Sequence, residues 1–234
     1  MHATAETVTP AEQDYLKEIY LLIEDSGRAT TRMLADRLGV KPPSVTAMIK
    51  RLADDGDGPM VTHTPYRGVE LTDRGRAVAL EMLRHHRLIE LFLSELLGVP
   101  WDQVHAEAHR LEHVFSEDLE ERIAAKLGHP DFDPHGDPIP SREGTMVSRS
   151  LTRLTALPAG ASAVIARIER QDPEVLQYLA TLSLTPGTQI VIEAVAPFGG
   201  VRTVRVGEGP EAVVHPVGEE LARYILTGPA AGQE

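Results

Sequence analysis

Apolar residues in the first quarter of the chain recur with the period of a helix. Tyr15, Ile19 and Leu22 share one face of residues 11–25, so we expect a helix there that ends at Ser26-Gly27. The same reasoning predicts a helix from Thr30-Thr31 to Gly39 and another from Pro42-Pro43 to about residue 55, with the prolines at its start. Two helices joined by a tight turn with glycine are typical of a helix-turn-helix.

The next segment alternates like a hairpin and then returns to a helical pattern. Short strands at Met60-Val61 and at residues 69–71, joined by a loop over 64–68, predict a β-hairpin wing. Three helices are expected after it. They begin after Thr72, at Trp101 and after Ser116, and they end at Leu97, about Val114 and Leu127.

The residue pattern in the last third of the chain is no longer mainly helical. Residues 129–149 are rich in Pro, Gly and Asp, which indicates a linker. Short β-branched runs follow, with one helix over 173–180, and they predict a small all-β barrel. The expected strands are residues 163–168, 189–196, 201–206 and 211–214. The fold class is therefore mainly α with a small β domain.

Composition limits the functions available. The 234 residues include no cysteine, which excludes disulfides, cysteine nucleophiles and thiolate metal sites. No apolar run approaches the roughly eighteen residues of a membrane span, and no export signal begins the chain, so we expect a cytoplasmic protein without a membrane partner. The net charge is −12, yet residues 28–76 hold nine Lys and Arg against six Asp and Glu, so the predicted DNA-binding segment is locally basic.

One helical segment gathers metal-binding side chains on a single face. Its members stand at i, i+4, i+7 and i+8 and are His105, His109, Glu112 and His113. His86 and Glu90 form a further i, i+4 pair on the preceding helix. Imidazole and carboxylate ligands suit Mn(II), Fe(II), Co(II) or Zn(II). A solvated helix face would mix in Lys, Arg and Gln, so we interpret the stripe as a metal site.

Two other functions are compatible with parts of the chain. Residues 109–113 spell H-x-x-E-H, the inverted zinc-peptidase signature, in which His109 and His113 would hold zinc and Glu112 would act as the base. That hypothesis leaves the remaining ligands and the helix-turn-helix unexplained. The C-terminal barrel could instead be a peptide-binding module, but its aromatic residues are sparse.

Four motifs in fixed order resemble the diphtheria toxin repressor family, which includes the manganese-transport regulators. They are YRGVELTDRG, RHHRLIE, VHAEAHRLEHVFSE and HGDPIP. The resemblance implies a metal-dependent transcriptional repressor, not an enzyme, that binds palindromic operator DNA as a homodimer. It also implies three domains: a winged helix-turn-helix over 1–75, a helical metal-binding and dimerisation domain over 76–140, and an SH3-like (FeoA-like) domain over 150–228.

The resemblance further implies two neighbouring metal sites. His109, Glu112 and His113 match the primary site, which also takes Asp14 from the first helix. His86, Glu90 and His105 match the ancillary site, for which Asp172 aligns as a loose additional ligand. Iron-responsive members carry Cys at the His109 position and Met at the Asp14 position. The manganese regulators share the aspartate but have carboxylates at the His109 position and an acidic ligand in place of Lys17.

We therefore expect Mn(II) as the activating ion, with Fe(II) as the alternative, and Zn(II) or Co(II) able to substitute in vitro. DNA contacts are expected at the start of the recognition helix, from Lys41, Pro43, Ser44, Thr46 and Ala47. Phosphate contacts are expected from Thr31, Lys50, Arg51 and, at the tip of the wing, Arg67.

Overall fold

A computed structural model describes residues 8–56, 58–64, 68–198 and 200–230 of the chain. The chain forms two compact units. The first comprises residues 1–86, 109–122 and 140–146, and the second comprises residues 87–108, 123–139 and 147–234.

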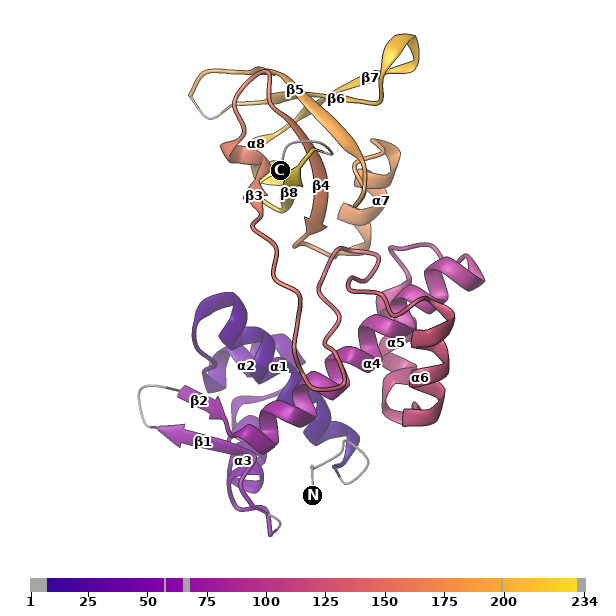
Figure 1. Cartoon of the computed structure of the whole chain (residues 1–234). Coiled ribbons are helices and arrows are strands. Elements are labelled where there is room, and N and C mark those ends of the chain that lie inside the picture. The colour runs from indigo at the N-terminus through magenta and orange to yellow at the C-terminus, as the bar shows by residue number, and fades with distance from the viewer. Residues whose placement is uncertain (1–7, 57, 65–67, 199, 231–234) are drawn as a thin grey trace. The chain divides into compact units, whose positions relative to one another are not determined.

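The first unit opens with the three predicted helices, α1 (Pro10–Ser26), α2 (Thr31–Leu38) and α3 (Pro42–Ala53). Each has a local cause for its start: Glu12 accepts a hydrogen bond from the Thr9 backbone N–H, the Thr30 hydroxyl caps α2, and prolines open α3. Glycines in the left-handed conformation end α1 and α2. The predicted helix-turn-helix is confirmed (Figure 1).

The wing and the core of this unit follow. Strands β1 (Val61–Thr64) and β2 (Gly68–Leu71) pair antiparallel, with Val61 opposite Leu71 and Thr64 opposite Gly68. The loop tip lies outside the described residues. The core beneath combines apolar side chains of α1, α2, α3 and the long helix α4 (Asp73–Leu97), including Leu16, Ile19, Leu34, Leu52 and Met82.

The helix expected from Trp101 begins later and ends differently. Residues 101–103 form a turn, α5 spans Val104–Leu111, and a 3-10 turn covers Glu112–Val114. Helix α6 spans Glu117–Lys126. Within the second unit, the Trp101 ring stacks on His135 with centroids 5.7 Å apart. Trp101 therefore serves the packing of a neighbouring segment rather than a helix start.

The first part of the predicted linker is built into the second unit. Phe132 forms a β-bridge with Pro138, and Oδ1 of Asp133 accepts hydrogen bonds from the backbone N–H groups of His135 and Asp137. All three polar side chains in this turn are buried. The expectation of a plain linker is wrong for this stretch, because its polar groups bond one another instead of water.

A six-stranded antiparallel sheet forms the C-terminal part, in the order β3-β8-β4-β5-β6-β7. Its strands are β3 (Thr152–Arg153), β4 (Ser162–Ile168), β5 (Gln189–Val195), β6 (Arg202–Val206), β7 (Val213–Val217) and β8 (Ile225–Pro229). The short helices are α7 (Pro173–Thr181) and α8 (Glu219–Ala222). Residue patterning did not predict β3, β8 or α8, which are short or follow a polar segment. The mainly α fold with a small β domain is confirmed.

None of the helices in the described ranges combines the length and the apolar character needed to cross a membrane.

Gly136 supplies a test of how the buried turn is held. Its φ is +88°, and a Cβ there would lie 1.9 Å from the carbonyl oxygen of Ala166. Gly160 has a similar φ of +85° but open space around it. We expect Gly136→Ala to lower the free energy of unfolding by about 3 kcal/mol or more, and Gly160→Ala by about 1 kcal/mol, because only the first adds a clash to the backbone strain.

The readout is a urea titration followed by the fluorescence of Trp101, the only tryptophan in the chain. If both variants lose the same free energy of unfolding, the close approach of Gly136 to β4 does not contribute to stability.

Candidate metal centre

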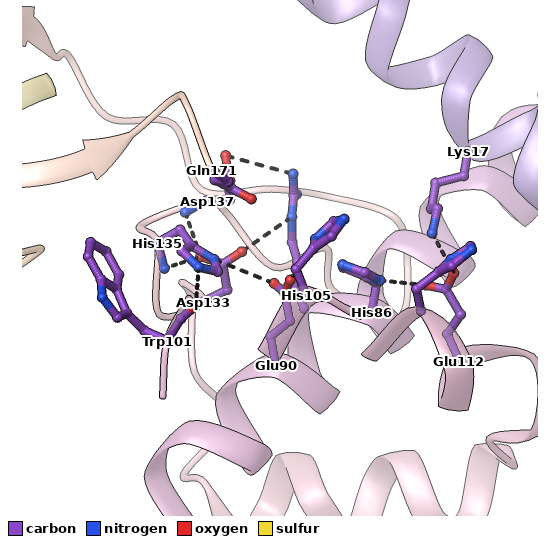
Figure 2. A network of polar contacts seen from close by, with 12 residues as sticks. Lys17, His86, Glu90, Trp101, His105, Glu112, Asp133, His135, Asp137 and Gln171 are labelled. Atoms are coloured by element: carbon purple, nitrogen blue, oxygen red, sulfur yellow. Dashed lines mark hydrogen bonds and ion pairs between the residues drawn. The ribbon is translucent and has the colours of Figure 1, made fainter. Parts of the chain in front are cut away.

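The buried carboxylate of Glu112 is the hub of the first unit's polar residues. Glu112 is 1% exposed and stands where α5 tightens into the 3-10 turn. Its Oε1 lies 2.5 Å from Lys17 Nζ and 2.7 Å from His109 Nδ1, and its Oε2 lies 2.7 Å from His86 Nδ1. Figure 2 shows Lys17 and His86 approaching Glu112 from different helices. One carboxylate thus joins α1, α4 and α5.

These contacts set the charge of the centre. Burial by itself would raise the pKa of Glu112, but hydrogen bonds from His109 and His86 and the charge of Lys17 hold it far below its usual value. The hydrogen bond to Glu112 in turn raises the pKa of His109. Glu112 is therefore an anion surrounded by cationic or proton-donating partners.

Four predicted ligands come together at this point. Asp14, His109, Glu112 and His113 each offer one ligand atom, and these atoms all lie within 4.8 Å of one another. His113 Nε2 is 3.2 Å from Asp14 Oδ1, and its Nδ1 is 2.7 Å from Gln13 Oε1. The set has two imidazoles and two carboxylates, which suits a divalent first-row cation.

The remaining predicted helical ligands lie along α4 and α5. In the second unit, His105 Nδ1 is 3.0 Å from Glu90 Oε1, and Glu90 is buried. His86 stands one turn before Glu90 on α4, as the sequence requires, but its Nδ1 contacts Glu112 of the other set. The sequence did not predict that contact.

A further cluster escaped the sequence reasoning. Glu90, Asp133 and His135 are all buried, with ligand atoms within 4.8 Å of one another. His135 Nε2 lies 2.9 Å from the Trp101 carbonyl oxygen (Figure 2), and its Nδ1 lies 3.8 Å from Glu90 Oε2. Burial by itself would lower the pKa of His135, but its interaction with Glu90 and the charges of Asp133 and Glu90 raise that pKa to about 9. The only signal in the sequence was the HGDPIP motif, which composition marked as linker.

Asp172, the loosely aligned ligand, has a different environment. It is exposed at the N-cap of α7, and its Oδ2 accepts a hydrogen bond of 2.6 Å from Arg170. Asp172 belongs to none of the ligand clusters found among the described residues. Its neighbour Gln171 instead donates to Asp137 Oδ2 at 2.6 Å.

The predicted DNA contacts lie mostly on open surface. Exposed residues on α3 and its N-cap are Lys41, Pro43, Ser44, Thr46, Ala47, Lys50 and Arg51. Arg51 Nε is paired with Glu12 Oε1 at 2.7 Å, and the Thr46 hydroxyl donates to the Pro42 carbonyl oxygen. Thr31 is half-buried at the start of α2, and Arg67 lies outside the described residues.

Family models match three successive parts of the chain. The N-terminal DNA-binding domain of iron-dependent repressors matches residues 7–69, their metal-binding and dimerisation domain matches residues 72–141, and the FeoA domain matches residues 152–226. The chain is 35% identical over 215 residues to the iron-dependent repressor IdeR of Mycobacterium tuberculosis, covering 86% of this chain and 91% of that protein. It belongs to the diphtheria toxin repressor family.

Other relatives extend the comparison. The diphtheria toxin repressor of Corynebacterium efficiens is 31% identical over 188 residues, which cover 76% of this chain and 80% of that protein. A solved manganese-dependent transcriptional repressor in complex with manganese has a TM-score of 0.82 at 38% identity, covering 94% of this chain and all of that one. The IdeR of T. acidophilum has a TM-score of 0.69 at 32% identity, covering 93% of this chain and 97% of that one.

The protein is thus a metal-dependent transcriptional repressor and not an enzyme. This overturns the peptidase hypothesis for residues 109–113. The geometry agrees with that outcome, because both oxygens of Glu112 contact other side chains instead of facing a water to be activated.

Proposed function

We propose that the repressor binds operator DNA as a homodimer when Asp14, His109, Glu112 and His113 hold a divalent cation. The observation that carries this proposal is the convergence of these four ligand atoms within 4.8 Å, one from α1 and three from α5 and its 3-10 turn. The donor set fits such an ion in type and number. An ion there would supply positive charge that binds the DNA-binding helices to the helix carrying the ligands.

The coupling to DNA follows from where Asp14 stands. Helix α1 packs against α2. An ion that holds Asp14 therefore also holds the helix-turn-helix in one position relative to residues 109–113, which carry the other three ligands. In a dimer this sets the separation of the two recognition helices, which the helical repeat of DNA requires. The ion is bound by all four ligand atoms only when α1 is held in this arrangement. It therefore binds the DNA-competent arrangement more tightly than any other, which is the differential affinity that allostery requires. Because the repressor acts on DNA, we propose that it works in the cytoplasm.

We further propose an ancillary site formed by His86, Glu90 and His105. Support comes from the 3.0 Å contact between His105 and Glu90 and from the i, i+4 spacing of His86 and Glu90 on one helix. Asp133 and His135 are the additional ligands that the geometry favours beside Glu90, in place of the exposed Asp172.

Operator recognition is assigned to the exposed face of α3. Lys41, Ser44 and Lys50 are exposed at or beyond the start of this helix, while Val45 and Ile49 are buried beneath them. We propose that Lys41, Pro43, Ser44, Thr46 and Ala47 form the surface that reads base edges, and that Thr31, Lys50, Arg51 and Arg67 contact phosphates.

Removing a ligand should uncouple metal from DNA. At a fixed Mn(II) concentration that saturates the wild type, we expect Asp14→Ala and His113→Ala to weaken operator binding at least about tenfold, the scale of an ordinary allosteric coupling. The measurement is a gel shift with and without chelator. His215→Ala, in β7, is the control and should bind like the wild type. Metal-dependent binding that survives in His113→Ala would refute the primary ligand set.

Lys17 should set the Mn(II) concentration at which the primary set binds its ion. Its ammonium group is a built-in cation on Glu112 Oε1, and an incoming metal ion must replace it. We expect Lys17→Met to bind Mn(II) about tenfold more tightly or better, since a hydrogen bond to a charged group contributes about 1.5–3 kcal/mol. Isothermal titration measures this, with Lys126→Met, an exposed lysine at the end of α6, as control. Unchanged or weaker Mn(II) binding by Lys17→Met would contradict the competition.

We propose Mn(II) as the physiological ion, with Fe(II) as the alternative; Zn(II) and Co(II) are expected to substitute in vitro. The primary set contains no sulfur ligand, and hard donors suit Mn(II), which lies lowest in the divalent affinity order. The proteins that it resembles include both iron-dependent and manganese-dependent repressors.

The test compares operator binding across free Mn(II) and Fe(II) under anaerobic conditions. The wild type should respond at lower free Mn(II) than Fe(II), and Asp14→Met should shift the response toward Fe(II), because a thioether replaces a carboxylate. Asp25→Met, at the end of the same helix, should leave the preference unchanged. A wild type that responds first to Fe(II) would overturn the assignment.

A further inference from the structure

A separate cluster of charged groups lies in the first unit beside the primary set. Glu81 and His85 occupy successive turns of α4, and Glu117 opens α6. One ligand atom from each lies within 4.8 Å of the other two. None of the three belongs to the ligand stripe that the sequence singled out.

His85 gives this cluster an independent sign of a missing partner. The residue is 3% exposed, and its ring packs edge-on against Phe115. Its Nε2 lies 2.9 Å from Glu120 Oε2 without the alignment of a hydrogen bond, and its Nδ1 also has no hydrogen-bond partner among the residues that the structure describes. Buried polar atoms are rarely left in this state, because the loss of hydration is not compensated.

The surrounding charges favour a cation. Glu120 is balanced by Arg84, whose Nε is 2.7 Å from Glu120 Oε1. Glu117 has one partner in the half-exposed Arg142, 3.0 Å from its Oε2. Glu81 and Glu117 bring two carboxylates to within ligand distance of the His85 ring.

There is also room for an ion. A small cavity of about 30 Å³ is lined by Glu81, His85 and Glu117, with Met82 and Phe115 among its other walls. A cavity of this size holds one water molecule or one ion. It also touches Gln13, Glu112 and His113, so it lies directly beside the primary ligands.

We propose that Glu81, His85 and Glu117 form an additional divalent-cation site, distinct from the primary and ancillary sites. Two carboxylates and one imidazole are donors of the type that Mn(II) and Zn(II) accept. An ion here ties the first turn of α6 to α4, against the wall of the primary set. This assignment does not depend on which residues hold the activating ion.

The experiment counts Mn(II) ions per chain by equilibrium dialysis and elemental analysis, at a concentration that saturates the wild type. Glu117→Gln and His85→Gln should each bind one ion fewer. Asp118→Asn is the matched control: it removes a carboxylate one residue along α6, exposed and paired with Arg122, and should keep the wild-type count. His113→Ala combined with Glu117→Gln should lose one more ion than His113→Ala alone.

A second measurement covers the case in which a variant does not fold. Crystals of the Mn(II)-loaded wild type should show an anomalous scattering peak between Glu81 and Glu117. The proposal is overturned if that peak is absent, as it would be with water alone in the cavity, or if folded Glu117→Gln keeps the full count. Either result leaves the primary set untouched, since that set is tested separately by His113→Ala and the operator.

Discussion

The position of α1 relative to residues 109–113 depends on the interactions of one buried carboxylate. Glu112 meets Lys17 from α1, His86 from α4 and His109 from its own helix, and little water reaches it. A buried carboxylate without such partners is strongly destabilising, so the three contacts are a condition for burying Glu112 at all. Helix α1, which packs against α2 of the helix-turn-helix, is thereby connected to the proposed metal ligands.

Helical spacing predicted much of this centre, and its limits have a physical cause. The spacing of His105, His109, Glu112 and His113 fixes which side chains share a face, because that follows from one helix alone. It does not fix what another helix brings to that face. The contacts of Lys17 and His86 with Glu112 depend on tertiary packing between segments about 95 and 26 residues apart, so no local pattern contains them.

The buried turn at residues 131–139 shows a different limit. Its Pro, Gly and Asp residues predict a turn, and the left-handed Gly136 and the hydrogen bonds of Asp133 confirm it. The same composition says nothing about burial, which here comes from Trp101, Arg87 and the β4 strand closing over the turn. Asp133 and His135 were consequently overlooked as candidate ligands, although helix and strand patterns located the main elements around them.

The charge pattern gives a reason for the repressor to depend on metal. An acidic protein gains little from long-range attraction to DNA, so its recognition surface must be held in the right geometry to bind well. The ligands that we propose are carboxylates and imidazoles that already contact internal cations and proton donors, with Lys17 on Glu112 as the clearest case. Metal binding is then an exchange of one cation for another. Such an exchange raises the ion concentration that the repressor needs, because the metal must first displace Lys17 from Glu112.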